Sequence, residues 1–453
     1  MNVSPARHTA RTVLSQVRER DAYGHEVLSA ALRSAKLEAP DAAFATRLVY
    51  GVLQTAGTLD EALARYIAQR HIEPRVRDSL RLAAYELLFQ RTEPRAAVHQ
   101  GVELVRAVRP QAAGLANAVL RRLATDADSF PWGDPDSDDG ALARLYGHPR
   151  WLADLWIREL GRVDAARVMA ADNEPAPLFL AANPFAGSAE DAWSALQADG
   201  AEPEHCVPSG CIVSREAGAA VRGDALASGI VIAVDAAAQL VAQLVHPVSQ
   251  QAIVEIGAGR GTKTLLLQAL ATASGGPANI LAVDVHAFKS RLLEERLAHL
   301  GVPGVSTLTA DATALNGVLG APDPGSVDAV LVDAPCSGLG TLRRHPEKRW
   351  RVSEGDIGSV ARLGASLLQA ASHLVRVGGF VVYSTCTLAN AENSDVIDAF
   401  LASEEGQGFS PDSLGQDVPA EWRHWLVGDS VFRSLPTSGG PDGHFAVRLR
   451  RTT

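Results

Sequence analysis

The chain has 453 residues, which is too long for one ordinary hydrophobic core and indicates two or three domains. Hydrophobic residues make up 47% and charged residues 21%, as is typical of soluble globular proteins, and we find no uninterrupted apolar run of the ~18 residues that a membrane span requires. The net charge of −10 argues against a protein that coats nucleic acid indiscriminately.

The first residues contain neither the apolar core nor the small-residue cleavage site of a secretory signal, so we expect a cytoplasmic protein. The four cysteines, Cys206, Cys211, Cys336 and Cys386, are too few for a disulfide scaffold. Cys206 and Cys211 could form half of a metal site. No second pair of Cys or His residues with suitable spacing follows them, so we expect no bound metal.

Residues 1–125 are predicted to form an all-helical domain. Apolar residues recur at spacings of three and four in the segments 11–17, 44–53 and 80–89, and prolines lie between such segments, where they can open or end helices. Residues 1–124 contain 18 Lys and Arg against 12 Asp and Glu. This excess favours an electropositive surface that binds nucleic acid and an ordinary solvated helical face about equally.

The segment 126–140 is rich in Asp, Pro, Gly and Ser, which predicts a linker or a long surface loop. Residues 141–230 mix helical stretches with short strand-like pieces, and we interpret them as a small α+β region. This region separates the helical domain from the rest of the chain.

From residue 231 to 453, short β-branched runs alternate with longer helical ones. Strands are predicted at 252–256, 280–284, 305–309, 327–333 and 380–385, with helices at 263–271, 288–300 and 359–375 between them. This alternation indicates a Rossmann-like α/β domain with a doubly wound, mostly parallel sheet. Because ligands bind beyond the carboxyl ends of such strands, the functional residues should follow directly after each strand.

The residues after the first three strands predict a site for a nucleoside cofactor. Glycines at three alternate positions from Gly257 to Gly261 allow a tight turn and a close approach to a ligand. Asp284 ends the second strand, where a carboxylate can accept hydrogen bonds from ribose hydroxyls, and Asp311 follows the third. The G-x-G-x-G spacing favours S-adenosylmethionine over a dinucleotide. The expected cofactor-binding residues are Gly257, Ala258, Gly259, Arg260, Gly261, Thr262, Lys263, Asp284, Asp311 and Asp333.

Two cysteines follow the fourth and fifth strands, in Asp333-Ala-Pro-Cys336-Ser-Gly and Ser384-Thr-Cys386-Thr. A thiolate that adds to carbon 6 of cytosine makes carbon 5 nucleophilic enough to accept a methyl group, which is covalent catalysis. Asp333 is the candidate acid near ring nitrogen 3. Each cysteine alone could be a small buried hydrophobe, but their shared position at this edge favours a catalytic pair.

The stretch after Cys336 is strongly basic. It contains Arg343, Arg344, His345, Lys348 and Arg349, which could lower the pKa of a neighbouring thiol and hold RNA phosphates. A solvated basic turn is the alternative, and we predict RNA contact.

These two cysteine motifs, with Glu392-Asn393 and the stretch Arg343–Trp350, resemble the Nop/Sun family of RNA cytosine-5 methyltransferases. The resemblance implies a class I methyltransferase domain in which the later cysteine, Cys386, attacks the base and Cys336 assists product release. The usual Cys-Ala-Ala-Pro-Gly-Gly-Lys-Thr loop of that family is replaced by Gly257-Ala-Gly-Arg-Gly-Thr-Lys-Thr264, which is closer to the generic methyltransferase loop.

The N-terminal region resembles NusB-like RNA-binding domains, through the segments 80–88, 97–106 and 116–122. A NusB-like domain fused to this catalytic domain resembles the bacterial RsmB type, which modifies small-subunit ribosomal RNA. The resemblance therefore implies RNA as the partner, and we expect a monomer. The competing hypotheses are a non-catalytic RNA-binding, assembly or antitermination factor and, less well supported, a nicotinamide-dependent oxidoreductase.

Overall fold

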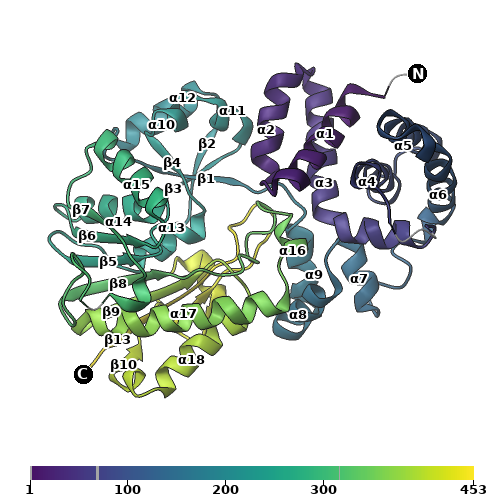
Figure 1. Cartoon of the computed structure of the whole chain (residues 1–453). Helices are drawn as coiled ribbons and strands as arrows, with labels where there is room; N and C mark the ends of the chain where they lie inside the picture. Colours follow the sequence, from purple (N-terminus) through teal and green to yellow (C-terminus); the bar gives the residue numbers. More distant parts are fainter. Residues whose placement is uncertain (1–2, 68–70, 316) are drawn as a thin grey trace. The chain divides into compact units, whose positions relative to one another are not determined.

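The computed structural model describes residues 3–67, 71–315 and 317–453. The chain divides into two compact units (Figure 1). Unit 1 comprises Met1–Pro175 and Leu342–Ser353, and unit 2 comprises Ala176–Thr341 and Glu354–Thr453. The chain therefore passes between the units three times, and twice within the part of the sequence that follows Cys336.

Unit 1 is built from helices, as the apolar spacing predicts. They are α1 (Pro5–Arg20), α2 (Gly24–Ala35), α3 (Ala39–Ala64), α4 (Pro74–Leu88), α5 (Pro94–Val108), α6 (Ala113–Asp126), α7 (Asp139–Leu145), α8 (Arg150–Leu160), α9 (Arg162–Ala171) and α16 (Lys348–Arg351), with 3-10 turns at Pro110–Ala112 and Ala127–Ser129. Pro5, Pro74 and Pro94 each begin a helix, where the missing N–H is not needed. Leucines and valines of α1 to α6 form one continuous core.

The segment 126–140 packs against the helices of unit 1. Phe130 is buried in the helical core, and the guanidinium of Arg65 lies 4.3 Å from the ring centre of Trp132. Arg144 also donates a 2.7 Å hydrogen bond to the carbonyl of Pro131. The helices α7 to α9 belong to unit 1 as well.

The first part of unit 2 carries a small antiparallel sheet, with strand order β2-β3-β1-β4. Its strands are β1 (Leu178–Ala182), β2 (Pro203–Cys206), β3 (Cys211–Ser214) and β4 (Val231–Ala233), and its helices are α10 (Ala189–Ala198), α11 (Ala217–Arg222) and α12 (Asp224–Ala227). Cys206 and Cys211 face each other directly across the β2–β3 pair. The β2–β3 hairpin accounts for the short spacing between these two cysteines.

The rest of unit 2 forms the large sheet, in the order β11-β12-β13-β9-β8-β5-β6-β7, with β10 beside β13. Its strands are β5 (Ala252–Ile256), β6 (Asn279–Asp284), β7 (Val305–Thr309), β8 (Val327–Asp333), β9 (Val375–Thr385), β10 (Phe409–Pro411), β11 (Leu426–Val427), β12 (Val431–Arg433) and β13 (Phe445–Arg451). Strands β5 to β9 pair in parallel and β13 joins β9 antiparallel. The predicted Rossmann-like fold is confirmed.

Helices cover both faces of this sheet (Figure 1). Alternate residues of each strand point to opposite faces. One set packs with α13 (Ala236–Gln243), α14 (Thr262–Ala273) and α15 (Ala287–Leu300). The other set packs with α17 (Glu354–Leu374) and α18 (Ser394–Ala402). Strands buried on both faces read as continuous apolar runs, which explains why the sequence revealed them.

Candidate active site

The register of the parallel strands brings the predicted site residues to one edge of the large sheet. Ile256 of β5 pairs with Val283 of β6 and with Val332 of β8, and Asp333 pairs with Ser384 of β9. The residues that follow these strands therefore meet at the carboxyl edge. They include the loop 257–263, Asp284, Asp311, Asp333, Cys336 and Cys386.

The glycine loop after β5 lies against its neighbours with no room for side chains. Gly257 has φ of +82°, and a Cβ atom there would lie 2.4 Å from the carbonyl oxygen of Asp333. At Gly261, with φ of +80°, a Cβ atom would lie 2.1 Å from Leu293. Gly259 donates its N–H to Asp284 Oδ2 at 3.0 Å. This bare backbone forms a cradle in which a ligand can approach the loop closely.

Two carboxylates flank the cradle. Asp284 accepts hydrogen bonds from the N–H and ring of His286, at 2.8 and 3.0 Å, and its Oδ2 lies 3.5 Å from Lys289 Nζ. Burial alone would raise the pKa of Asp284, but these contacts hold the pKa below its usual value. Hydrogen bonds from Thr313 lower the pKa of Asp311 in the same way. Both side chains are therefore ionised acceptors for hydroxyl or amino groups.

Lys263 points from the cofactor loop towards the cysteine side of the site. Its Nζ lies 2.7 Å from Asp333 Oδ2. Burial alone would lower the pKa of Lys263. The carboxylate of Asp333 and the charge of Cys386 hold this pKa above its usual value. The proton that the sequence analysis assigned to Asp333 is thus available from the neighbouring Lys263 ammonium.

A second buried carboxylate lies beneath this pair. Glu255 of β5 is 1% exposed and accepts a 2.5 Å hydrogen bond from Thr264 Oγ1. Burial raises its pKa to about 8. A neutral Glu255 at physiological pH leaves Asp333 as the carboxylate that pairs with Lys263.

The two cysteine thiols lie side by side. Cys336 Sγ and Cys386 Sγ are 3.4 Å apart, and both residues are partly exposed. The hydrogen bond with Cys386, burial and the nearby Glu392 raise the pKa of Cys336 well above its usual value. Cys386 instead stabilises the positive charge of Lys263. These surroundings favour the protonated form of the Cys336 thiol.

Glu392 links the two cysteine loops and Asn393 braces the Cys386 loop, although their sequence pattern predicted no chemical role for either. Ser337, directly after Cys336, donates both its N–H and its Oγ–H to the Glu392 carboxylate, at 2.7 and 2.6 Å. Asn393 accepts from Thr385 Oγ1 at 2.6 Å and donates to the carbonyl of Thr387 at 3.0 Å. The hydroxyl side chains beside each cysteine were the available sequence signal.

Two arginines of the basic stretch after Cys336 are buried, so these two are not exposed to hold RNA phosphates as predicted. Arg343 and Arg349 are 3% and 0% exposed. Arg349 donates to the carbonyls of Gly147 and Asp172 at 3.2 Å each and to Asn173 Oδ1 at 3.0 Å. All three partners lie in unit 1, like α16 itself. Arg349 is therefore an internal anchor of unit 1.

Trp350 fixes the same segment to α3. Its Nε1–H points at the carbonyls of Leu53 and Gln54, at 3.0 and 3.2 Å. A Cβ atom on Gly57 would lie 2.1 Å from the Trp350 ring, so this glycine leaves the space that the indole occupies.

We expect Arg349→Met to destabilise unit 1 by about 3–5 kcal/mol, because the buried Asp172 carboxylate then loses the positive charge that compensates it. The thermal midpoint of unit 1 should fall by roughly 10 °C. Arg351→Met, in the same short helix but at an exposed position, should change the free energy of unfolding by less than about 1 kcal/mol. Calorimetric scans of the three proteins check this, and equal midpoints for wild type and Arg349→Met would show that the anchor is dispensable.

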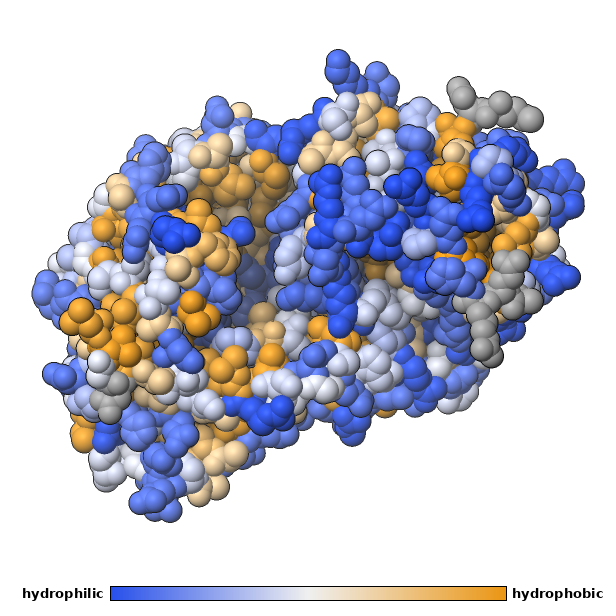
Figure 2. Space-filling view, in the orientation of Figure 1, coloured by the Kyte–Doolittle hydropathy of each residue, from blue (hydrophilic) through white to orange (hydrophobic). Residues whose placement is uncertain are grey.

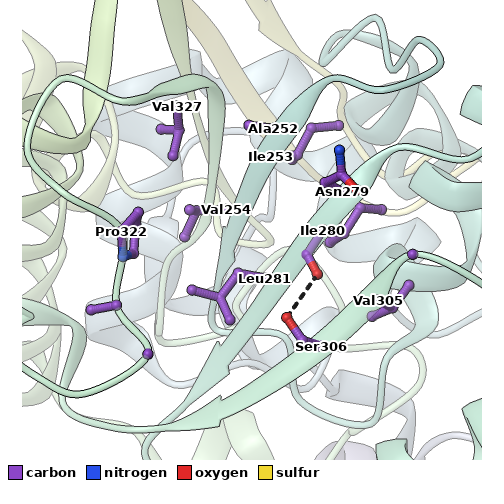
Figure 3. A pocket seen from close by; sticks show the side chains of 13 residues that line it. Ala252, Ile253, Val254, Asn279, Ile280, Leu281, Val305, Ser306, Pro322 and Val327 are labelled. Carbon is purple, nitrogen blue, oxygen red and sulfur yellow. Dashed lines mark hydrogen bonds between the residues drawn. The ribbon is translucent and has the colours of Figure 1, made fainter.

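The largest hollow that we describe in the sheet lies at its opposite, amino edge. It has a volume of about 520 Å³ and includes Ala252, Asn279 and Val327 at strand starts. Figure 3 shows mostly aliphatic side chains there, with Ser306 Oγ 3.5 Å from the carbonyl oxygen of Ile280. Its lining contains no charged side chain, so it offers no carboxylate, imidazole or amine for acid–base chemistry.

The described helices include none that is long and apolar enough to cross a membrane. Within residues 3–67, 71–315 and 317–453, no three His, Cys, Asp or Glu side chains gather in a way that could hold a metal ion.

Comparisons with protein families match three parts of the chain. The family described as 16S rRNA methyltransferase RsmB/F matches residues 242–450, the NusB family matches residues 4–125, and a ferredoxin-like domain of RsmF/B-like methyltransferases matches residues 148–219. The first match contains the cofactor loop and both cysteines.

Similar proteins match along nearly their whole length. A probable ribosomal RNA small subunit methyltransferase B from Synechocystis is 31% identical over 98% of this chain and 99% of its own. The ribosomal RNA small subunit methyltransferase B of Thermus thermophilus is 30% identical over 100% and 99%. Among solved structures, PH0851 has a TM-score of 0.80 at 21% identity and covers 100% of both chains. NSun6 from Pyrococcus horikoshii has a TM-score of 0.55 at 19% identity, covering 67% of this chain and 98% of its own.

Proposed function

Since the chain belongs to the RsmB/F family of 16S rRNA methyltransferases, whose cofactor is S-adenosylmethionine, we propose that it methylates carbon 5 of a cytosine in small-subunit ribosomal RNA. Cys386 attacks the base and forms the covalent intermediate. The observation that carries this proposal is the pair of thiols 3.4 Å apart at the edge where the cofactor loop ends.

The different surroundings of the two thiols support Cys386 as the nucleophile. A positive charge nearby favours a thiolate, and a negative charge or burial favours a thiol. Cys386 interacts with the Lys263 ammonium, whereas Cys336 is close to the Glu392 carboxylate. The resemblance of the two motifs to the Nop/Sun family supports the same assignment.

The protein supplies a nucleophile, acid and base groups and a hydrogen-bond donor to the reaction. The Cys386 thiolate adds to carbon 6 while a proton from the Lys263–Asp333 pair reaches ring nitrogen 3, which gives a nucleophilic carbon 5. S-adenosylmethionine supplies the electrophilic methyl group. A base then removes the hydrogen from carbon 5, the bond between carbon 6 and Cys386 breaks, and the thiolate leaves as the proton on ring nitrogen 3 returns to the Lys263–Asp333 pair. The S–H of Cys336 stabilises that departing charge by hydrogen bonding.

The residues at the carboxyl edge fit this cofactor. The cradle presents bare backbone at Gly257, Gly259 and Gly261, and Asp284 and Asp311 are ionised acceptors for ribose hydroxyls and the adenine amino group. The side chains of His286 and Lys289 contact the Asp284 carboxylate in this structure. Both side chains are partly exposed, so they can move aside when the ribose binds. Arg260 contributes a cation to the loop and fits the cofactor's carboxylate better than its sulfonium.

We expect Gly257→Ala to weaken binding of S-adenosylmethionine by about 10-fold or more, a loss of ~1.4 kcal/mol. The new methyl group would meet the Asp333 carbonyl at 2.4 Å at a positive φ, so the loop must shift. Gly301→Ala is the matched control, because Gly301 has φ of +63° with open space around it. Titration calorimetry should give similar affinities for wild type and Gly301→Ala; an unchanged affinity in Gly257→Ala would place the cofactor elsewhere.

Unit 1 is proposed to bind the RNA. Arg95, Arg121 and Arg122 on α5 and α6 are exposed, and Figure 2 shows hydrophilic residues over much of the visible face of this unit. Several other arginines neutralise acidic partners, as Arg7 does with Glu86 and Arg81 with Asp60. The exposed arginines are therefore the ones that can contact phosphates.

The test of the function is nucleoside analysis of 16S ribosomal RNA after incubation with the protein and methyl-labelled S-adenosylmethionine. The proposal expects the label in 5-methylcytidine. Label in another nucleoside would refute the assignment of carbon 5. Failure to bind S-adenosylmethionine at millimolar concentration, with RNA binding intact, would instead support a non-catalytic RNA-binding or assembly factor.

A further inference from the structure

Glu392 connects the two cysteine loops although it belongs to neither. The residue is 1% exposed and lies in a 3-10 turn, Asn390–Glu392, six residues after Cys386. Besides its two bonds from Ser337, its Oε1 accepts a hydrogen bond from Thr387 Oγ1 at 3.2 Å. One carboxylate therefore contacts the residue directly after Cys336 and the residue directly after Cys386.

We call the set of Glu392, Ser337 and Thr387 the bracket, and further hydrogen bonds reinforce it. Tyr383 donates its hydroxyl to the backbone carbonyl of Glu392 at 2.8 Å, and Ser337 Oγ lies 2.9 Å from Thr387 Oγ1. The backbone of the Cys336 loop is also tied directly to the Cys386 loop, because Gly340 donates its N–H to the carbonyl of Cys386 at 3.0 Å. Hydrogen bonds to a buried charged group are stronger than neutral ones, so the carboxylate is the strongest tie in this set.

We propose that Glu392 is a positioning residue for the reaction: its buried carboxylate sets the placement of the Cys336 thiol against Cys386. It touches neither the base nor the cofactor in this role. The claim about thiol placement stands on the structure alone. The claim that this placement serves product release rests on the proposed function.

The placement of the thiols can be measured without any methylation. Diamide, an azo-dicarboxamide oxidant, takes two hydrogens from two thiols as an S–S bond forms and its N=N bond is reduced. Its rate of cross-linking Cys336 to Cys386, followed by peptide mass spectrometry, reports how often the two sulfurs meet. The Cys206–Cys211 pair in the β2–β3 hairpin provides an internal reference in the same molecule.

Glu392→Ala should slow the Cys336–Cys386 cross-link by about 10-fold or more, because the two thiols lose their enforced proximity, and should leave the Cys206–Cys211 rate unchanged. Glu392→Gln keeps an acceptor for Ser337 and should stay within about 3-fold of wild type. Glu404→Ala, at an exposed site in the following turn, should match wild type. A wild-type cross-linking rate in Glu392→Ala would overturn the proposal.

If Glu392→Ala also alters the Cys206–Cys211 cross-linking rate, the fold has changed. The milder substitutions Ser337→Ala and Thr387→Val then test the bracket. Combined, they should slow only the Cys336–Cys386 cross-link, by about 3-fold or more, because each hydrogen bond contributes modestly. An unchanged rate would refute the bracket.

The kinetic consequence is tested separately with RNA and S-adenosylmethionine. Glu392→Gln and Glu392→Ala should retain cofactor affinity, and Glu392→Ala should accumulate a covalent RNA adduct as its turnover falls. Slow turnover without an adduct would refute the role in release. If wild type itself makes no 5-methylcytidine, the proposed function fails while the cross-linking result still decides the bracket.

Discussion

We expect Cys386→Ala to lose RNA methylation, with kcat falling by roughly 10³-fold or more, because the variant lacks the nucleophile of the proposed covalent mechanism. Carbon 5 of cytosine does not attack a methyl sulfonium effectively until a nucleophile has added to carbon 6. Cys386 is the thiol at this edge that interacts with an ammonium, that of Lys263. Transfer of labelled methyl groups to 16S ribosomal RNA, measured with saturating cofactor, gives the comparison.

The matched control is Cys206→Ala. Cys206 is a partly buried cysteine in β2, and its removal should leave kcat within about 2-fold of wild type because surface-proximal changes away from a site are usually mild. Cofactor affinity should be unchanged in both variants. Methylation by Cys386→Ala at the wild-type rate would eliminate this cysteine as the nucleophile.

We expect Cys336→Ala to slow turnover in a different way, because the role proposed for this thiol follows the transfer of the methyl group. Loss of a hydrogen bond to a charged group costs ~1.5–3 kcal/mol, which corresponds to about 10- to 100-fold slower departure of the Cys386 thiolate. The methylated RNA should therefore stay attached to the protein. Denaturing gels should show a band of protein bound to RNA that depends on S-adenosylmethionine and is weak in wild type.

The double variant Cys336→Ala/Cys386→Ala separates this account from its alternative. It should form no adduct, because no attacking thiol remains. An adduct that persists in the double variant, or one that fails to form in Cys336→Ala while turnover is lost, would mean that Cys336 does not serve release.

The architecture of unit 2 was predictable because its strands are buried on both faces. The runs at 252–256 and 327–333 are almost purely apolar, and the structure has β5 and β8 at those bounds. Parallel pairing then fixes which residues meet, since the carboxyl ends share an edge. The juxtaposition of Cys336 with Cys386 follows from this rule, although their 3.4 Å separation does not.

The anchor in unit 1 could not be predicted from local sequence. Arg343, Arg349 and Trp350 lie in a basic stretch that has the composition of an exposed loop, and a burial site for a guanidinium is made only by tertiary structure. Gly147, Asp172 and Asn173, the partners of Arg349, are about 200 residues away in sequence. The burial of this segment therefore depends on residues that lie far away in the sequence.

Lys263 and Glu392 illustrate a second limit of prediction from the sequence. The sequence placed Lys263 in a loop for the cofactor, but only the structure shows its ammonium beside Asp333. Glu392 lies within a motif that the sequence made visible, yet its carboxylate acts through Ser337 of another loop. Side-chain direction across a strand edge depends on packing, which a spacing pattern does not encode.

The most direct test of the central claim is mass spectrometry of the wild-type protein after incubation with S-adenosylmethionine and 16S ribosomal RNA that contains 5-fluorocytidine. Fluorine at carbon 5 cannot leave as a proton, so the intermediate persists and can be digested to a peptide that carries the modified base. We predict that the peptide contains Cys386 and that the base carries the new methyl group. Attachment of the base to Cys336, or methylated RNA with no covalent bond to any cysteine, would contradict the account.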